Sequence, residues 1–251
     1  MKKFFTLIAA VAMAASVNAQ TETVVIPALA DGVESQAYSG EKTLKTVNAQ
    51  IVLGDDGEPF TVKSGKLAND APYVSYIQGK NNAKDAAGKG YSVANANLPT
   101  TGCYYVFSAS KPGKVEIGMQ LGNAKSFFVC DGETGQNSVT KTLIDKTGAT
   151  VTLGVNKDSK TGNDIPESVA AKFYGTVNFN VEANKSYYVF CTGSKLAFYG
   201  YQFTPGTDTG ISNINASEAA NEGATFNLLG QKVASNAKGL VIKNGKKFIN
   251  K

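Results

Sequence analysis

Apolar residues alternate with polar or small residues in several stretches of this chain, and this alternation restricts the fold more than any other feature. In residues 115–121 every second residue is apolar, and residues 150–155 and 177–182 repeat the pattern. Successive side chains of a β-strand point to opposite faces of a sheet, so each stretch is predicted to be a strand with one buried and one solvated face. Such sheets are antiparallel and pack face to face, which predicts an all-β protein with an antiparallel β-sandwich.

Further strand signals recur between clusters of Gly, Asn, Asp and Pro. They fall at residues 23–26, 50–53, 59–63, 73–78, 104–108, 126–130, 187–192 and 196–203. Two longer polar segments, residues 79–98 and 156–166, interrupt the series and are predicted to be loops. Loops often carry the binding residues of a rigid β scaffold, so both segments are candidates for a binding site.

The first nineteen residues differ from the rest of the chain. Lys2 and Lys3 precede an apolar run, and small residues stand before Gln20. This is the pattern of a cleaved secretory signal, and the run is too short for a membrane anchor. We therefore expect a signal peptide over residues 1–19, a mature protein that is secreted or held at the outer cell surface, and no membrane span.

Three parts are predicted beyond the signal. Residues 20–204 hold the series of strands and form the sandwich, and residues 205–223 have the composition of a linker. Residues 224–251 contain short apolar runs, two of which flank Asn244-Gly245, a two-residue turn typical of a β-hairpin. A small C-terminal β module is expected there, too short to bury an independent core.

Three residue types that carry much of enzyme and recognition chemistry are missing, because the chain has no His, no Arg and no Trp. Without His there is no Ser-His-Asp or Cys-His nucleophile system and no histidine zinc site. Without Arg there is no bidentate partner for phosphate. The net charge is +5, yet residues 20–206 carry 17 Lys and 17 acidic residues. A neutral main domain of this kind is not expected to bind nucleic acid.

Three cysteines, Cys103, Cys130 and Cys191, lie beside or inside predicted apolar strands. Free Cys often behaves as a small buried hydrophobic residue, and this is the expected role. A single disulfide is the alternative in an oxidising compartment, with the pairing left open. A catalytic thiol is disfavoured, because no His is present to activate it.

Candidate ligand-binding residues are those that suit a sugar. Sugar recognition uses aromatic faces for the apolar side of the ring, and amide, carboxylate or ammonium groups for the hydroxyls. Tyr91 stands in a Gly-flanked segment together with Asn81 and Asn82. Further candidates are the strand tyrosines and two lysines that could bind hydroxyls or a uronate: Tyr73, Tyr76, Tyr199, Tyr201, Lys125 and Lys195. The alternative is that these tyrosines pack within the sandwich, with only their hydroxyls at its rim.

Two oxygen-rich segments are candidates for a structural Ca²⁺ site. One contains Asp55, Asp56 and Glu58, and the other contains Asp158, Asn163, Asp164 and Glu167. Neither has the ligand spacing of an EF-hand. Solvated turn acids are the default interpretation, and no other cofactor is expected.

Several strand motifs in the main body have a familiar form. They are Leu98-Pro-Thr-Thr-Gly-Cys-Tyr-Tyr-Val-Phe107, Lys125-Ser-Phe-Phe-Val129, Tyr174-Gly-Thr-Val-Asn-Phe179, Lys185-Ser-Tyr-Tyr-Val-Phe190 and Gly193-Ser-Lys-Leu-Ala-Phe-Tyr-Gly-Tyr-Gln-Phe203. In these motifs the chain resembles the galactose-binding-like, jelly-roll β-sandwich modules of secreted Bacteroidota polysaccharide-utilisation proteins, including modules attached to pectate lyases. The resemblance implies a jelly-roll fold and carbohydrate binding.

A second resemblance concerns the tail. It rests on Phe226-Asn-Leu-Leu-Gly-Gln-Lys-Val233 and on Lys238-Gly-Leu-Val-Ile-Lys-Asn-Gly-Lys-Lys-Phe-Ile-Asn-Lys251. This pattern is similar to the C-terminal sorting modules of Bacteroidota type IX secretion cargo, at the short end of their length range. It implies that the tail contacts the secretion machinery or the cell surface.

The resulting hypothesis is a secreted, non-catalytic carbohydrate-binding module that captures a polysaccharide or oligosaccharide at the cell surface. The alternative is a structural or adhesive surface protein that binds a protein partner or matrix. A polysaccharide lyase or glycoside hydrolase acting through a pair of carboxylates is the third hypothesis.

Overall fold

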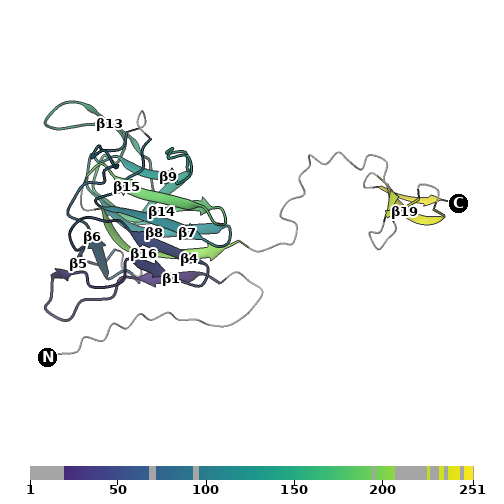
Figure 1. Ribbon diagram of the computed structural model, residues 1–251, viewed down its shortest axis with the longest axis horizontal. Helices are drawn as coiled ribbons and strands as arrows, with labels where there is room; N and C mark the ends of the chain where they lie inside the picture. The colour runs from purple at the N-terminus through teal and green to yellow at the C-terminus, as the bar shows by residue number, and fades with distance from the viewer. Residues whose placement is uncertain are drawn as a thin grey trace. The chain divides into compact units, whose positions relative to one another are not determined.

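The computed structural model describes residues 20–67, 72–92, 96–193 and 196–206, and in the C-terminal part residues 225–226, 232–234, 237–243 and 246–250. The predicted signal peptide and most of the predicted linker lie outside these residues. The chain divides into two compact units, Met1–Thr207 and Asp208–Lys251. Every regular element in the described residues is a β-strand, which confirms the predicted all-β class (Figure 1).

The larger sheet of the first unit has nine strands, and all its pairs are antiparallel. In spatial order they are β11 (Thr150–Val151), β10 (Lys141–Asp145), β14 (Phe173–Val181), β8 (Gly113–Leu121), β16 (Ala197–Pro205), β6 (Ser75–Gln78), β5 (Thr61–Ser64) and β2 (Ser35–Ala37), with β1 (Glu22–Val25) also paired to β16. The predicted strand over residues 115–121 is thus the central strand β8, and residues 177–181 belong to its neighbour β14.

The smaller sheet of this unit has five strands, again all antiparallel. Its order is β3 (Thr43–Lys45), β4 (Ala49–Leu53), β7 (Tyr104–Ala109), β15 (Ser186–Cys191) and β9 (Phe127–Asp131). The core lies between the two sheets, because the ring of Phe107 on β7 contacts rings of the larger sheet. Its centroid lies 6.3 Å from that of Phe179, 5.4 Å from that of Tyr201 and 6.0 Å from that of Phe203. Each large side chain buried in this way contributes about 1.5–3 kcal/mol.

One predicted loop is a β-ribbon in the structure. Residues 154–168 contain β12 (Gly154–Lys157) and β13 (Asp164–Ser168), which pair antiparallel as a separate two-stranded sheet. The prediction of a loop over residues 156–166 was therefore wrong at both ends. Its polar composition reflects a solvated ribbon that is held by backbone pairing and by a turn in which Gly162 has a φ of +70°.

The outer faces of the two sheets are not simply solvated, contrary to the expectation from alternation. On the smaller sheet, Ala83 and Tyr91 lie over Phe128, Cys130 and Phe190, and we call these five residues the Tyr91 cluster. On the larger sheet, a second cluster joins a segment before β6 to the start of β16. Its buried members are Leu67, Tyr73, Ala197 and Tyr199, with Tyr76 and Tyr174 packed against them, and we call these six the Tyr199 cluster. Segments outside the sheets therefore cover part of each outer face.

The C-terminal unit contains four short strands, ordered β18 (Lys232–Val233), β17 (Thr225–Phe226), β19 (Gly239–Lys243) and β20 (Lys246–Asn250). Lys243 on β19 pairs with Lys246 on β20, as expected for the predicted hairpin, and Asn244-Gly245 lies outside the described residues. The described part of the chain includes no helix with the length and apolar character needed to cross a membrane.

Candidate functional site

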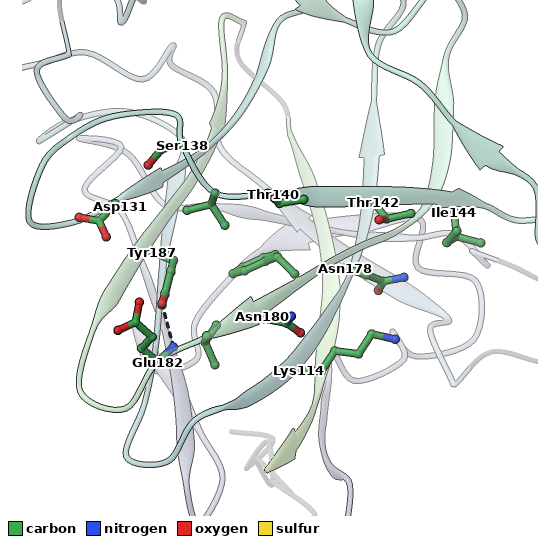
Figure 2. Close-up of a pocket in the computed structure, with 13 residues that line it drawn as sticks. Lys114, Asp131, Ser138, Thr140, Thr142, Ile144, Asn178, Asn180, Glu182 and Tyr187 are labelled. Carbon is green, nitrogen blue, oxygen red and sulfur yellow. Dashed lines mark hydrogen bonds between the residues drawn. The ribbon is translucent and has the colours of Figure 1, made fainter. Parts of the chain in front are cut away.

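A polar pocket of about 660 Å³ opens at one edge of the sandwich, and we call it the edge pocket (Figure 2). Its walls come from β8, β10 and β14 of the larger sheet, from β9 and β15 of the smaller sheet, and from the segment that joins β9 to β10. The lining residues are Lys114, Asp131, Ser138, Val139, Thr140, Thr142, Ile144, Asn178, Phe179, Asn180, Val181, Glu182 and Tyr187.

The pocket forms because β10 covers only part of the edge of β14. Pairing between the two strands begins at Lys141 and Phe179 and runs back to Asp145 and Gly175. The last two residues of β14, Asn180 and Val181, therefore extend past the start of β10. Residues 132–140 cross from β9, the edge strand of the smaller sheet, to β10, the second strand of the larger sheet, and the space between this segment and β14 is the pocket.

The wall of the pocket that lies on the outer face of the larger sheet is polar. Asn178 lies between Thr142 on β10 and Glu116 on β8, and Asn180 lies beside Lys114. The Oδ1 atom of Asn178 is buried and has no hydrogen-bond partner among the described residues. Leaving a buried acceptor unpaired costs about 1–3 kcal/mol, so a ligand hydroxyl that reached this oxygen by displacing the atoms that cover it would remove that cost.

Tyr187 stands on the opposite side of the pocket, where its hydroxyl accepts a hydrogen bond of 2.8 Å from the Glu182 backbone N–H (Figure 2). Burial raises the pKa of Tyr187 above its usual value, although the N–H bond acts in the other direction. The phenol is therefore neutral at physiological pH. Because this hydroxyl is an acceptor towards Glu182, its own proton is available to a ligand.

The charged groups of the edge pocket have partners of their own. Asp131 Oδ1 accepts hydrogen bonds of 2.9 Å from the backbone N–H groups of Glu133 and Thr134, and these bonds lower the pKa of Asp131. The Lys114 ammonium lies 2.8 Å from Glu116. Glu182 pairs with Lys185 at 3.1 Å. The pocket therefore offers hydrogen-bonding groups and one carboxylate, Asp131, that has no ion-pair partner among the described residues, above an apolar floor that includes Phe179, Val139 and Val181.

Tyr91, the first sugar-binding candidate from the sequence, is buried in the Tyr91 cluster with 9% of its surface exposed. Its ring centroid lies 4.7 Å from that of Phe128 and 5.2 Å from that of Phe190. The hydroxyl donates to the Gly135 carbonyl and accepts from the Asn137 N–H, both at 3.1 Å. These contacts are those of a packing residue that fastens the segment around residue 91 to residues 135–137.

The candidates that accompanied Tyr91 lie near this cluster. Asn82 is exposed and, with Tyr91, lines a smaller hollow of about 130 Å³. The Asn81 side chain donates to the backbone carbonyl of Asp56 at 2.7 Å. Lys125 is exposed and its side chain passes close to Gly193. Lys195 lies outside the described residues.

The strand tyrosines separate into two places. Tyr73, Tyr76 and Tyr199 gather in the Tyr199 cluster on the outer face of the larger sheet. Tyr201 is in the core, and its hydroxyl donates to the Ala49 carbonyl of the smaller sheet at 3.0 Å. The predicted binding residues that the structure describes are therefore distributed over three regions of the sandwich, and none of these lines the edge pocket.

Each acid of the second predicted Ca²⁺ segment has a local partner. Asp158 Oδ1 accepts hydrogen bonds from the N–H groups of residues 160 and 161, which lower its pKa. Asp164 pairs with Lys157, Glu167 lies 3.4 Å from Lys141, and the Asn163 carbonyl accepts the Asp158 N–H.

The first predicted Ca²⁺ segment is similar. Asp56 accepts the N–H groups of Lys80 and Asn81, Asp55 pairs with Lys42, and Glu58 pairs with Lys80. Within the residues that the structure describes, no group of three or more His, Cys, Asp or Glu side chains is arranged to hold a metal ion.

All three cysteines are free and buried, as the interpretation of small core residues expected. Burial raises the pKa of Cys130 to about 11 and that of Cys191 to about 12, and it also raises the pKa of Cys103. The thiols are therefore protonated at neutral pH and are poor nucleophiles.

Sequence reasoning did not identify the edge pocket. The signal that was present is the polar half of the alternation in residues 177–182, namely Asn178, Asn180 and Glu182. Such residues were interpreted as an ordinary solvated face, because a strand pattern does not say where a neighbouring strand stops.

Comparison with known proteins adds no assignment to this geometry. No protein-family model matches the chain, and no curated protein sequence is significantly similar to it.

Proposed function

We propose that this protein is a secreted, non-catalytic carbohydrate-binding β-sandwich and that the edge pocket is its sugar-binding site. The observation that carries the proposal is the unpartnered Oδ1 of Asn178 in a pocket lined by amide, hydroxyl and phenol groups. A sugar presents a ring of hydroxyls that can each donate and accept, together with C–H surfaces that suit an apolar floor. The charges of Lys114 and Glu182 are each paired with an opposite charge, which favours a neutral sugar unit in this pocket.

The chemistry of the pocket supports binding without turnover. A glycosidase needs one carboxyl group that stays protonated near neutral pH and a second that stays ionised. The pKa of Asp131 is lowered, so this group is ionised, and Glu182 is engaged by Lys185. Neither carboxyl has the apolar surroundings that would make it a proton donor.

Export is part of the same proposal and is supported by the signal pattern of residues 1–19. The tail, residues 224–251, would then serve in surface sorting. N-terminal sequencing of the exported protein is expected to begin at Gln20, and a chain that keeps Met1 would contradict export by this signal.

The binding test uses two pocket variants and one matched control. Asn178→Leu removes the unpartnered acceptor, and Asn180→Ala removes an exposed amide beside it. Gln36→Ala removes an exposed amide from β2, at the other end of the larger sheet. A glycan array followed by calorimetry is expected to show binding by the wild type and by Gln36→Ala, and a loss of about tenfold or more in each pocket variant, since an unpaired polar contact costs about 1–3 kcal/mol.

Two other results would separate the remaining functions. Assays for reducing ends and unsaturated products are expected to stay at background, and turnover would show an enzyme. The absence of any glycan ligand would favour an adhesive protein.

A further inference from the structure

A second polar surface lies on the outer face of the larger sheet and differs from the edge pocket in its charge. We call it the lysine–tyrosine patch, and it consists of Tyr76, Tyr174, Lys146 and Lys172. The Lys172 ammonium lies 4.8 Å from the centre of the Tyr174 ring, and the Lys146 ammonium lies 5.8 Å from it. Ammonium groups are attracted to the negative face of such a ring, so Tyr174 holds two positive charges close together.

These two lysines have no carboxylate partner among the described residues, where six other lysines do. Asp145 is adjacent in sequence to Lys146. Its Oδ1 accepts bonds from Thr147 and from the Ala149 N–H, so it is engaged with its own turn. Two like charges held near one ring repel each other, and an anion bound beside them would relieve that repulsion.

The patch also offers aromatic surface. Tyr76 is half-buried, and its ring centroid lies 5.0 Å from that of the buried Tyr199. Tyr76 and Tyr174 pack against the same buried residues of the Tyr199 cluster, which places these two members of the patch near one another. A half-exposed phenol beside two ammonium groups suits a ligand with both a C–H face and a negative charge, which is the chemistry of a sugar acid.

The position of the patch connects it to the edge pocket. Alternate residues of β14 point to the outer face of the larger sheet, and Tyr174, Thr176, Asn178 and Asn180 therefore follow one another along that face. Asn178 and Tyr174 are four residue steps apart, which corresponds to about 13 Å along the strand. A chain of sugars bound at Asn178 can thus continue along β14 to the two lysines.

We infer that the lysine–tyrosine patch is a second subsite, which binds an acidic sugar unit of the same polysaccharide whose neutral unit occupies the edge pocket. This inference rests on the proposed carbohydrate binding for the nature of the ligand chain. Charge complementarity and the shared face of β14 select a uronate-containing polysaccharide as the occupant.

The test compares partly methyl-esterified polygalacturonate, which carries both neutral and acidic units and is called polygalacturonate below, with the fully methylated ester, which carries no charge, by calorimetry at low and high salt. The wild type is expected to bind polygalacturonate more tightly, with the difference reduced at high salt. The double variant Lys146→Gln/Lys172→Gln is expected to bind polygalacturonate about three- to tenfold more weakly and the ester unchanged, which is the effect of two exposed charge contacts. The double variant Lys111→Gln/Lys160→Gln removes the same charge from exposed lysines outside the patch and should leave both affinities unchanged.

Two tyrosine variants test how the lysines are held. Tyr174→Phe keeps the ring and should keep the preference for the acid, whereas Tyr174→Ala removes the ring and should lose it. Thermal unfolding of both variants shows whether a loss of binding reflects a loss of folding. A preference that survives in folded Tyr174→Ala would overturn the role of the ring.

Failure of the inference and failure of the proposed function give different results. Equal binding of the acid and the ester, with Asn178→Leu weakening both, would overturn the acidic subsite and leave carbohydrate binding intact. Binding of neither polymer, with an array that shows no glycan ligand, would overturn both. Polyglutamate that binds as tightly as polygalacturonate would show an acidic peptide as the occupant and overturn the sugar assignment.

Discussion

On the outer face of the smaller sheet the Tyr91 hydroxyl has two hydrogen-bond partners, whereas on the larger sheet the Oδ1 of Asn178 has none among the described residues. Tyr91 was a binding candidate in the sequence, whereas Asn178 was interpreted as part of an ordinary solvated strand face. The difference indicates that the number of hydrogen-bond partners, and not residue type or loop position, separates a group that stabilises the fold from a group that could bind a ligand. The Tyr91 cluster is structural by this criterion, and the outer face of β14 is the proposed recognition surface.

The largest predicted effect is on the free energy of unfolding when Tyr91 is replaced, and it is the strongest test of this comparison. Tyr91→Ala leaves a cavity between Phe128 and Phe190 and should lower the free energy of unfolding by about 3–5 kcal/mol, measured by chemical denaturation. Tyr91→Phe keeps the ring and removes both hydroxyl bonds, so it should cost less. If Tyr91→Ala abolished glycan binding and left the unfolding midpoint unchanged, Tyr91 would be a ligand contact and the comparison would be wrong.

A smaller effect is expected from pH, through Cys130 beneath Tyr91. Its pKa rises from 9.0 to about 11 on folding, mainly because burial disfavours the thiolate. Unfolded chains lose the proton near pH 9, whereas the folded protein retains it, so the stabilisation is complete below pH 9 and is lost as the pH rises towards 11. Denaturation curves across this range should fall more steeply for the wild type than for Cys130→Ala. Parallel curves would show that the thiol is not shielded from solvent.

The smallest effect on stability, and the sharpest contrast, is expected at Asn178. Replacing an unpaired buried acceptor with an apolar residue of similar size breaks no hydrogen bond and removes the free-energy cost of burying an unpaired polar atom. Asn178→Leu should therefore unfold within about 1 kcal/mol of the wild type, or be more stable, while binding is lost. A decrease as large as that of Tyr91→Ala would mean that the Asn178 amide stabilises the fold.

The strands were largely predictable because their alternation records burial directly. Residues 115–121 lie within β8, residues 177–181 within β14, and residues 187–191 within β15. The strands β2 and β3 were not predicted, because each has only three residues and no buried side chain to produce an alternation. Short edge strands are held by backbone hydrogen bonds, which do not require a recognisable pattern of side chains in the sequence.

The site was less predictable, because it depends on contacts between distant segments. Tyr91 with its neighbouring Gly and Asn residues has the composition of a binding loop, and only its contacts with Phe128, Phe190 and Asn137 show that it packs. The edge pocket depends on where β10 begins relative to β14, and no local pattern encodes that offset. Tyr73, Tyr76 and Tyr199 on the larger sheet were named as binding candidates and stay a prediction, whereas Tyr174 and its two lysine neighbours were not named.

The two bonds of the Tyr91 hydroxyl end on Gly135 and Asn137, within the same crossing segment, residues 132–140, that walls the edge pocket. This wall of the pocket is thus fastened by a side chain that does not itself line the edge pocket. Substitutions in the Tyr91 cluster are therefore expected to change the width of the opening without altering the side chains that line it, so that affinity for the proposed ligand would change while the proposed recognition groups along β14 stay the same.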